Sequence, residues 1–219
     1  MKRGVRSYVL RQSRTSPAQQ RALETLMPVY GIEYRQEILD TRAVFRRQAP
    51  LVLEIGSGMG ETTVRIAAQR PDTDFIAVEV HGPGVGSLLK RIDELGLKNL
   101  RVVRHDALEV LEHMVADASL AAIHLFFPDP WPKKRHHKRR LVQPEFAALA
   151  ARKLAPGGVL HAATDWEDYA AQMIDVLSAS PGFERVEASG ARPETKFELR
   201  GVKLGHKVHD FHFRRRPRS

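Results

Sequence analysis

A carboxylate and a set of alternating glycines stand at the end of the first apolar run, residues 51–55. The run contains Glu54 and leads directly into Gly56, Gly58 and Gly60. Glycines in this arrangement let a backbone turn sharply and come close to a bound molecule. The dinucleotide pattern G-x-G-x-x-G fails here, because Glu61 stands where the third glycine belongs. An acid beside the turn would also repel a pyrophosphate, which makes a nicotinamide oxidoreductase the weaker alternative.

The next two apolar runs also end in carboxylates. Glu79 ends the run that begins at residue 74, and Asp106 ends the run that begins at residue 99. In a sheet of parallel strands, ligands bind outside the carboxyl ends of the strands. A carboxylate at Glu79 could accept hydrogen bonds from both hydroxyls of a ribose, and Asp106 could meet an adenine amino group. Three acids at neighbouring strand ends therefore favour a positively charged nucleoside.

A proline-rich exit follows the fourth apolar run. Residues 126–132 read FFPDPWP, so prolines stand on both sides of Asp129 and Trp131. Proline fixes the backbone φ angle, which would hold one carboxylate and one indole beside the ligand crevice. A flat base could stack on the indole and hydrogen-bond to the carboxylate. The Lys and Arg residues between 133 and 140 follow at once and could clamp phosphates around that base.

Positive charge is concentrated in three segments of an otherwise acidic chain. The formal net charge is +9, from 35 Lys and Arg residues against 26 Asp and Glu residues. Residues 2–14, 133–140 and 214–218 hold 15 of the 35 cations and no acid, so the rest of the chain is net acidic. Such patches are typical of an electrostatic footprint for a polyanion, and together they indicate nucleic acid. The absence of cysteine excludes thiolate nucleophiles and cysteine-based metal clusters.

The elements that must position these residues alternate along the chain. Apolar runs of strand length are separated by segments of helical composition, which predicts βαβ units and a parallel sheet. We expect strands at 51–55, 74–80, 99–106, 119–127, 159–164, 183–186 and 208–213, and helices at 17–26, 61–70, 84–95, 107–115, 144–154 and 166–178. The predicted fold is α/β: a single doubly wound, mainly parallel sheet of about seven strands with helices on both faces. Residues 27–31 are expected to form a turn.

Several features have simpler interpretations. Trp166, Tyr169 and Met173 are spaced as one face of a helix, so we expect them to pack in the core. Three histidines lie at 206, 209 and 212, but the middle one would point away from the others in an extended strand, so no metal site is predicted. The first 20 residues lack the apolar region of a secretory signal, and no apolar stretch is long enough to span a bilayer. We expect a cytoplasmic protein.

Four motifs closely resemble the bacterial tRNA (guanine-N7-)-methyltransferase family. They are Leu53–Glu61 (LEIGSGMGE), Phe127–Arg140 (FPDPWPKKRHHKRR), Ala163–Trp166 (ATDW) and Thr195–Glu198 (TKFE). The resemblance extends from about residue 6 to residue 215, and the PDPWPKK block is its most specific part. Two positions depart from the family pattern, since Leu199 stands where members often have Arg and His209 where they often have Trp. These departures concern the detail of tRNA contact.

The resemblance implies a class I methyltransferase fold that uses S-adenosylmethionine, without a metal, to methylate N7 of a guanine in the tRNA variable loop. It implies a basic arm at 1–20, taken as flexible, and a methyltransferase domain at 21–219, in a monomer or homodimer. The cofactor site it implies comprises Glu54, Gly56, Gly58, Gly60, Glu79, Asp106 and Asp129, with Asp129 also the catalytic residue. The implied substrate site comprises Lys133, Asp165, Thr195, Lys196, Phe197 and Glu198, and the implied RNA contacts are Arg135, His136, His137, Lys138, Arg139 and Arg140.

Positioning rather than proton transfer should dominate such a reaction. Guanine N7 carries an in-plane lone pair and no proton, so no general base is needed to generate the nucleophile. We expect Asp129, helped by Asp165, to accept hydrogen bonds from the N–H edge of the guanine and orient it. Two alternatives remain at this point: a non-catalytic RNA-binding module on a degenerate cofactor fold, and a methyltransferase that acts on another RNA guanine.

Overall fold

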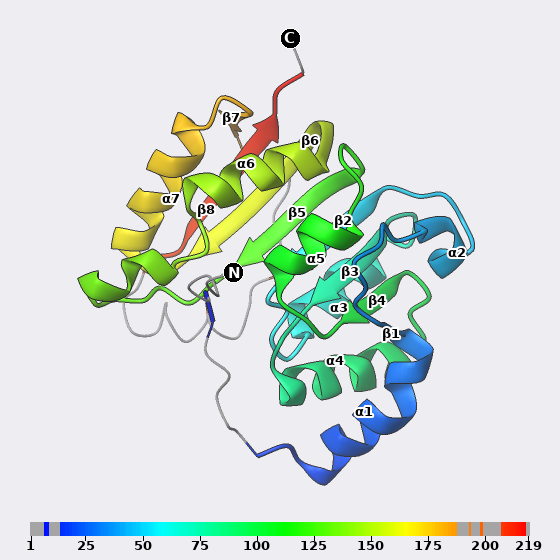
Figure 1. Ribbon diagram of the computed structural model, residues 1–219. Helices are drawn as coiled ribbons and strands as arrows, with labels where there is room; N and C mark the ends of the chain where they lie inside the picture. Colours follow the sequence, from blue (N-terminus) through cyan, green and yellow to red (C-terminus); the bar gives the residue numbers. More distant parts are fainter. Residues whose placement is uncertain (1–6, 9–13, 188–192, 194–197, 199–206, 218–219) are drawn as a thin grey trace.

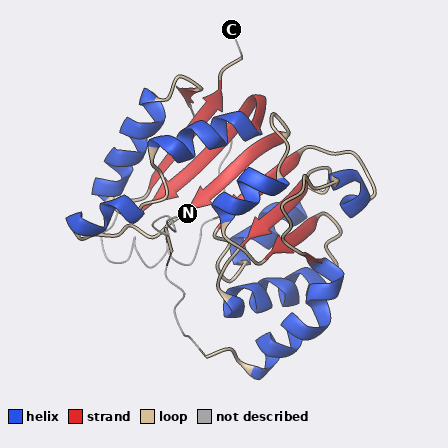
Figure 2. Ribbon diagram, in the orientation of Figure 1, coloured by secondary structure: helices blue, strands red, loops and turns tan. Residues whose placement is uncertain are grey.

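One eight-stranded sheet runs through the centre of the molecule (Figure 1, Figure 2). The computed structural model describes residues 7–8, 14–187, 193, 198 and 207–217. The strands lie in the order β1 (Gly31–Ile32), β4 (Leu100–Val103), β3 (Asp74–Val78), β2 (Leu51–Ile55), β5 (Leu120–Phe126), β6 (Leu154–Thr164), β8 (His209–Arg215) and β7 (Phe183–Val186). Neighbouring strands are parallel except in the two pairs that β8 makes, with β6 and with β7.

Helices cover both faces of the sheet. On one face, a hydrophobic cluster joins the strands to α2 (Thr41–Phe45), α5 (Ala107–Met114), α6 (Pro144–Lys153) and α7 (Glu167–Ala179). On the other face, a second cluster joins them to α1 (Pro17–Tyr30), α3 (Glu61–Gln69) and α4 (Gly82–Glu94). Every residue of β2 and β3 is buried, which explains why these central strands are almost continuously apolar in sequence.

The predicted fold class is confirmed, and the differences fall at its edges. β1 brings the number of described strands to eight; it has two residues, and among these strands it pairs only with β4. The turn expected at 27–31 is wrong, because α1 continues through Pro28 to Tyr30 and ends with the Gly31 N–H bonded to the Met27 carbonyl. The short helix α2 has no counterpart among the predicted elements.

Two further boundaries differ from the predicted ones. β6 begins at Leu154, five residues before the predicted strand, because the Pro-Gly-Gly sequence at 156–158 lies within the strand at a break in its register with β5. The boundary expected after residue 20 falls inside α1, which begins at Pro17 behind a Ser16 capping box. Gln19 in this helix donates a hydrogen bond to Ser87 of α4, so the first turn of α1 packs on the body of the fold. Among the described helices, none has the length and apolar character needed to cross a membrane.

Candidate active site

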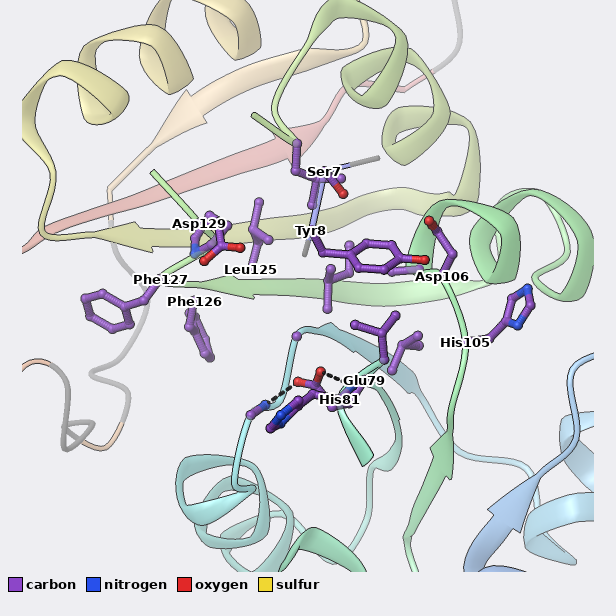
Figure 3. Close-up of a pocket in the computed structure, with 18 of the residues that line it drawn as sticks. Ser7, Tyr8, Glu79, His81, His105, Asp106, Leu125, Phe126, Phe127 and Asp129 are labelled. Carbon is purple, nitrogen blue, oxygen red and sulfur yellow. Dashed lines mark hydrogen bonds between the residues drawn. The ribbon is translucent and has the colours of Figure 1, made fainter. Parts of the chain in front are cut away.

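A cavity of about 420 Å³ opens at the carboxyl ends of β2, β3, β4 and β5 (Figure 3). Its volume is within the usual range for small-ligand sites, roughly 300–1,000 Å³. Three carboxylates predicted from sequence line it: Glu79, Asp106 and Asp129. No Lys or Arg is found among the described residues of the wall. A cavity with this lining favours a cationic ligand and disfavours a pyrophosphate.

The glycine turn forms part of the wall, but its three glycines do different things. Gly56 and Gly58 both have positive φ angles, and a Cβ built on either would meet no atom within 4 Å, so these positions leave open space beside the backbone. Gly60 is absent from the wall. A Cβ there would lie 2.4 Å from Cδ1 of Leu88 on α4. The structure therefore explains Gly60 by the packing of α3 against α4, whereas Gly56 and Gly58 face the cavity.

Glu79 follows β3 and braces the glycine turn. Its Oε2 accepts a hydrogen bond from the Gly58 N–H at 2.8 Å, and its Oε1 accepts one from the His81 N–H at 2.9 Å (Figure 3). A carboxylate oxygen has two lone pairs, so each retains capacity for a hydroxyl of a ligand. Glu79 can thus hold the turn and bind a ligand with the same carboxylate.

Asp106 and Asp129 are held by their local backbone. Asp106 is the N-cap of α5, and its Oδ1 accepts a hydrogen bond from the Leu108 N–H at 2.8 Å. Asp129 lies in the loop after β5, between two residues with positive φ angles, Phe127 at 52° and Trp131 at 44°. Left-handed backbone at large side chains persists only where the surrounding structure imposes it. The position of Asp129 is therefore strongly determined.

Glu54 lies outside the cavity wall, behind the glycine turn. Its side chain is buried within β2, and Oε1 accepts a hydrogen bond from the Thr63 hydroxyl of α3 at 2.9 Å. The pKa of this carboxyl is raised to about 7, chiefly by burial and also by the nearby charge of Glu79, whereas the Thr63 hydrogen bond lowers it. Its other oxygen, Oε2, has no hydrogen-bond partner among the described residues. The cofactor role predicted for Glu54 stays a prediction.

The Trp131 indole connects the loop to the beginning of the chain. Its Nε1–H donates a hydrogen bond to the Ser7 carbonyl at 3.0 Å. The Arg139 guanidinium lies over the ring, 4.5 Å from its centroid, and His136 meets the ring edge-on. Ser7 and Tyr8 both line the cavity, which the sequence did not indicate. No spacing or pattern relates an early tyrosine to strand ends so much later in the chain.

The basic loop forms a short 3₁₀ helix, Lys134–Arg139, and its side chains separate into two groups. Lys133, Lys134, Arg135 and Lys138 are exposed, whereas His136, His137 and Arg139 are half-buried. The exposed cations begin at Lys133, directly after the proline-rich segment that contains Asp129. They remain candidates for substrate and RNA contact.

Arg140 does not fit the predicted RNA contact. Its side chain is 1% exposed and stacks over the Tyr169 ring. Its guanidinium donates hydrogen bonds to the Pro130 carbonyl, to Gln172 and to Asp168. The Asp168 carboxylate has a pKa below its usual value, chiefly because Arg140 donates to it. Arg140 therefore fastens the loop to α7 and leaves no surface for a phosphate.

Asp165 lines a second hollow of about 720 Å³ at the start of α7, not the wall of the first cavity. Trp166, Lys207 and His209 line the same hollow, and Trp166 is exposed there rather than packed in the core as predicted. Tyr169 and Met173 are buried as expected. Of the predicted substrate motif, Thr195, Lys196 and Phe197, with the neighbouring Leu199, lie outside the described residues; Glu198 is half-buried.

Comparison with known proteins decides the family. Residues 48–211 match a family described as "Putative methyltransferase". Two proteins named "tRNA (guanine-N(7)-)-methyltransferase" are similar over 98% of this chain. The protein of Aromatoleum aromaticum is 58% identical, with 85% of its own length covered, and that of Methylobacillus flagellatus is 57% identical, with 93% covered. The chain belongs to the tRNA (guanine-N7-)-methyltransferase family.

Solved structures support the fold of this family member. A structure described as the 16S rRNA methyltransferase KamB superimposes with a TM-score of 0.62 at 17% identity, covering 86% of this chain and 99% of the other. The antibiotic-resistance methyltransferase Kmr gives a TM-score of 0.57 at 18% identity, covering 86% of this chain and 96% of the other. At such identities the likeness concerns the fold, a sheet with helices on both faces.

In the described part of the third basic segment, the three arginines at 214–216 contact the protein's own groups. Arg215 is buried and donates a hydrogen bond to the Leu154 carbonyl, Arg214 pairs with Glu184, and Arg216 donates to the Phe183 carbonyl. β8 runs antiparallel to β6, so these arginines lie at the edge of the sheet opposite the cavity. They hold the last strands together.

The described histidines near the C-terminus include one, His212, that packs within the sheet. His212 stacks on His161, with ring centroids 3.9 Å apart, and His161 faces Asp210 at 2.8 Å. His206 lies outside the described residues. Within the part of the chain that the structure describes, no group of three His, Asp or Glu side chains could hold a metal ion.

Proposed function

We propose that this chain transfers a methyl group from S-adenosylmethionine to N7 of a guanine in the variable loop of tRNA. The observation that carries the proposal is the acidic cavity, which Glu79, Asp106 and Asp129 line from the carboxyl ends of β3, β4 and β5. The names of the similar proteins, all at 55–58% identity, support the choice of tRNA and of guanine N7. Since tRNA is the substrate, we infer that the enzyme acts in the cytoplasm.

The residues of the cavity fit S-adenosylmethionine. Gly56 and Gly58 leave room beside the backbone, Glu79 retains acceptor capacity for ribose hydroxyls, and Asp106 would serve the adenine. When bound, the cofactor supplies an electrophilic methyl group on a positively charged sulfur. The carboxylates of the wall would stabilise that charge, and no Lys or Arg stands beside them among the described wall residues.

Asp129 would orient the guanine. N7 needs no general base, so the carboxylate contributes by accepting hydrogen bonds from the N–H edge of the base and by stabilising the positive charge that develops on the purine. Phe127 and Trp131 have left-handed backbone, which persists only where the surrounding structure holds the loop in one conformation. A fixed carboxylate loses little entropy when the base binds, which is the physical advantage of this strained loop.

The residues around Asp129 would hold the rest of the tRNA. Lys133, Lys134, Arg135 and Lys138 are exposed on the loop that follows it and would contact phosphates. Asp165, in the neighbouring hollow, would complete the substrate site together with residues of the Thr195–Glu198 motif. The basic residues between 2 and 14 would add to the same electrostatic attraction.

Asp129→Ala tests the catalytic assignment. We expect turnover to fall at least about a hundredfold, with tRNA affinity nearly unchanged, because the variant loses orientation of the base and not the phosphate contacts. Asp72→Ala is the matched control, since Asp72 is exposed in the turn before β3. Methyl transfer to tRNA is measured with labelled cofactor, and tRNA binding by filter retention. An Asp129→Ala variant as active as the control would contradict the role.

Two titrations and one mapping experiment separate the alternatives. Calorimetry with S-adenosylmethionine should give binding and calorimetry with NAD none, whereas a non-catalytic RNA-binding module would bind neither and an oxidoreductase would bind NAD. Mapping of the methylated nucleotide in bulk tRNA should give 7-methylguanine in the variable loop. A methylated guanine elsewhere would assign the enzyme to another RNA site.

A further inference from the structure

Tyr8 enters the cavity from outside the α/β body. Ser7 and Tyr8 line the cavity together with the strand ends, although they precede α1 in sequence. In Figure 3 the Tyr8 ring lies between Asp129 and Asp106, with its hydroxyl end directed toward Asp106. Both residues are half-buried. Two described residues that precede α1 thus add an aromatic side chain to the wall of the cavity.

A hydrogen bond from the Asp129 loop holds this segment in place. The donor is Nε1–H of Trp131, and the acceptor is the backbone carbonyl of Ser7, 3.0 Å away. Trp131 is itself constrained, by its left-handed backbone and by Arg139 over its ring. An indole N–H is a donor only and needs an acceptor when it is not fully exposed. The Ser7 carbonyl is that acceptor, and the hydrogen bond holds the backbone directly before Tyr8.

The neighbourhood of Tyr8 suits a planar purine. Apolar side chains of the strand ends, among them Ile55, Val78 and Leu125, line the same cavity. An aromatic ring facing such a wall leaves a slot with two apolar sides, and a purine ring gains both burial and ring–ring contact in a slot of this kind. Asp106, toward which the tyrosine hydroxyl is directed, is the acid that would meet an adenine amino group.

We propose that Tyr8 packs against the adenosine part of S-adenosylmethionine, and that the Trp131–Ser7 hydrogen bond positions it. The inference rests on the proposed function, because it takes the cavity to be the cofactor site. It adds a cofactor contact from the N-terminal segment to those from the sheet. It also links cofactor binding to the loop that carries Asp129, because one indole connects the two.

Calorimetric titration of the full chain tests the contact. We expect Tyr8→Ala to weaken S-adenosylmethionine binding by about tenfold, the effect of removing one good aromatic neighbour and its buried area. Tyr8→Phe should bind within about twofold of the wild type, because it keeps the ring. S-adenosylhomocysteine, which has the same adenosine, should lose affinity by a similar factor in Tyr8→Ala. A loss confined to S-adenosylmethionine would overturn the placement at adenosine.

Trp131→Phe tests the positioning role, because phenylalanine keeps an aromatic ring under Arg139 and removes the N–H donor. We expect cofactor affinity to fall by about threefold to fivefold, roughly the effect of one neutral hydrogen bond. In the Tyr8→Ala background the same change should have almost no further effect, since Trp131 would act through Tyr8. Fully additive losses would overturn this role, because a general structural defect would add to the loss at Tyr8. Thermal unfolding of each variant checks that it folds.

The outcomes separate this inference from the proposed function. Wild-type protein that fails to bind S-adenosylmethionine would contradict the proposed function itself. Wild-type binding that is unchanged in Tyr8→Ala would leave the cofactor site standing and overturn the role of Tyr8. Glu79→Gln serves as the positive control, because it alters a carboxylate of the sheet edge and should weaken binding with Tyr8 intact.

Discussion

Two basic segments that look alike in sequence, residues 133–140 and 214–216, differ in what their side chains contact. On the first, four cations are exposed beside the cavity. On the second, three arginines bind the protein's own carbonyls and one of its acids, at the far edge of the sheet. The sequence gives the number of charges in a segment but not the groups that those charges bind. A charge in a loop stays available to a ligand, whereas a charge on a strand between two other strands meets neighbours on both sides.

The largest expected effect concerns Arg215. Arg215→Ala should lower the free energy of unfolding by about 3 kcal/mol, because it leaves the Leu154 carbonyl without its donor and opens a buried space. Arg214→Ala, beside it, should cost less than about 1 kcal/mol, because that side chain is half-exposed and its ion pair with Glu184 is screened. Urea unfolding of both variants measures the difference. Equal losses of unfolding free energy in the two variants would contradict the claim that the buried Arg215 contributes more than Arg214.

The next effect concerns tRNA binding. Arg135→Gln combined with Lys138→Gln should reduce the salt dependence of tRNA affinity by about two in the slope of log K against log salt, about one for each phosphate that the variant no longer neutralises. Arg214→Gln combined with Arg216→Gln removes the same formal charge at the opposite edge and should leave the slope unchanged. Filter binding between about 50 and 200 mM salt measures both. Equal slopes in the two double variants would remove the distinction between the segments.

The smallest effect sharpens the division within the loop itself, at the ion pair between Arg140 and Asp168. Arg140 lowers the pKa of Asp168 below its ordinary 3.8, so this pair stabilises the fold fully above pH 3.8, and the contribution is lost as the pH falls through the lower, folded-state pKa. Asp168→Asn should therefore cost stability at pH 7, less than about 1 kcal/mol because the carboxylate is 63% exposed. The difference in unfolding free energy between wild type and Asp168→Asn should become smaller at acidic pH. A gap independent of pH would contradict the ionic origin.

The sequence predicts the centre of this fold better than its edges. β2 and β3 are buried on both faces, so their apolar runs are long enough to recognise. Glu79 after β3 and Asp106 after β4 fall at the same end of the sheet because these neighbouring strands are parallel. β1 has two residues, and its pairing with β4 leaves no pattern. Spacing groups Glu54 with the wall acids, but it stands within β2 rather than after it, and its side chain turns to Thr63.

Long-range contacts explain the remaining differences between expectation and structure. Tyr8 reaches the cavity because Trp131 binds the Ser7 carbonyl, and no local pattern encodes a hydrogen bond between segments so far apart. The burial of Arg140 depends likewise on Asp168 and Gln172 of α7. Residue type and spacing therefore predict which side chains gather at a strand end, but not which cations the protein uses internally.

The placement of β8 between β6 and β7 has a consequence for how the protein is made. Among the described strands, β7 pairs only with β8, which is synthesised after it. While the chain is emerging from the ribosome, β6 therefore presents an open edge and β7 has nothing to join. Exposed strand edges promote association between chains. Ribosome stalling between these two strands should yield nascent chains that need chaperones more than those stalled after β8.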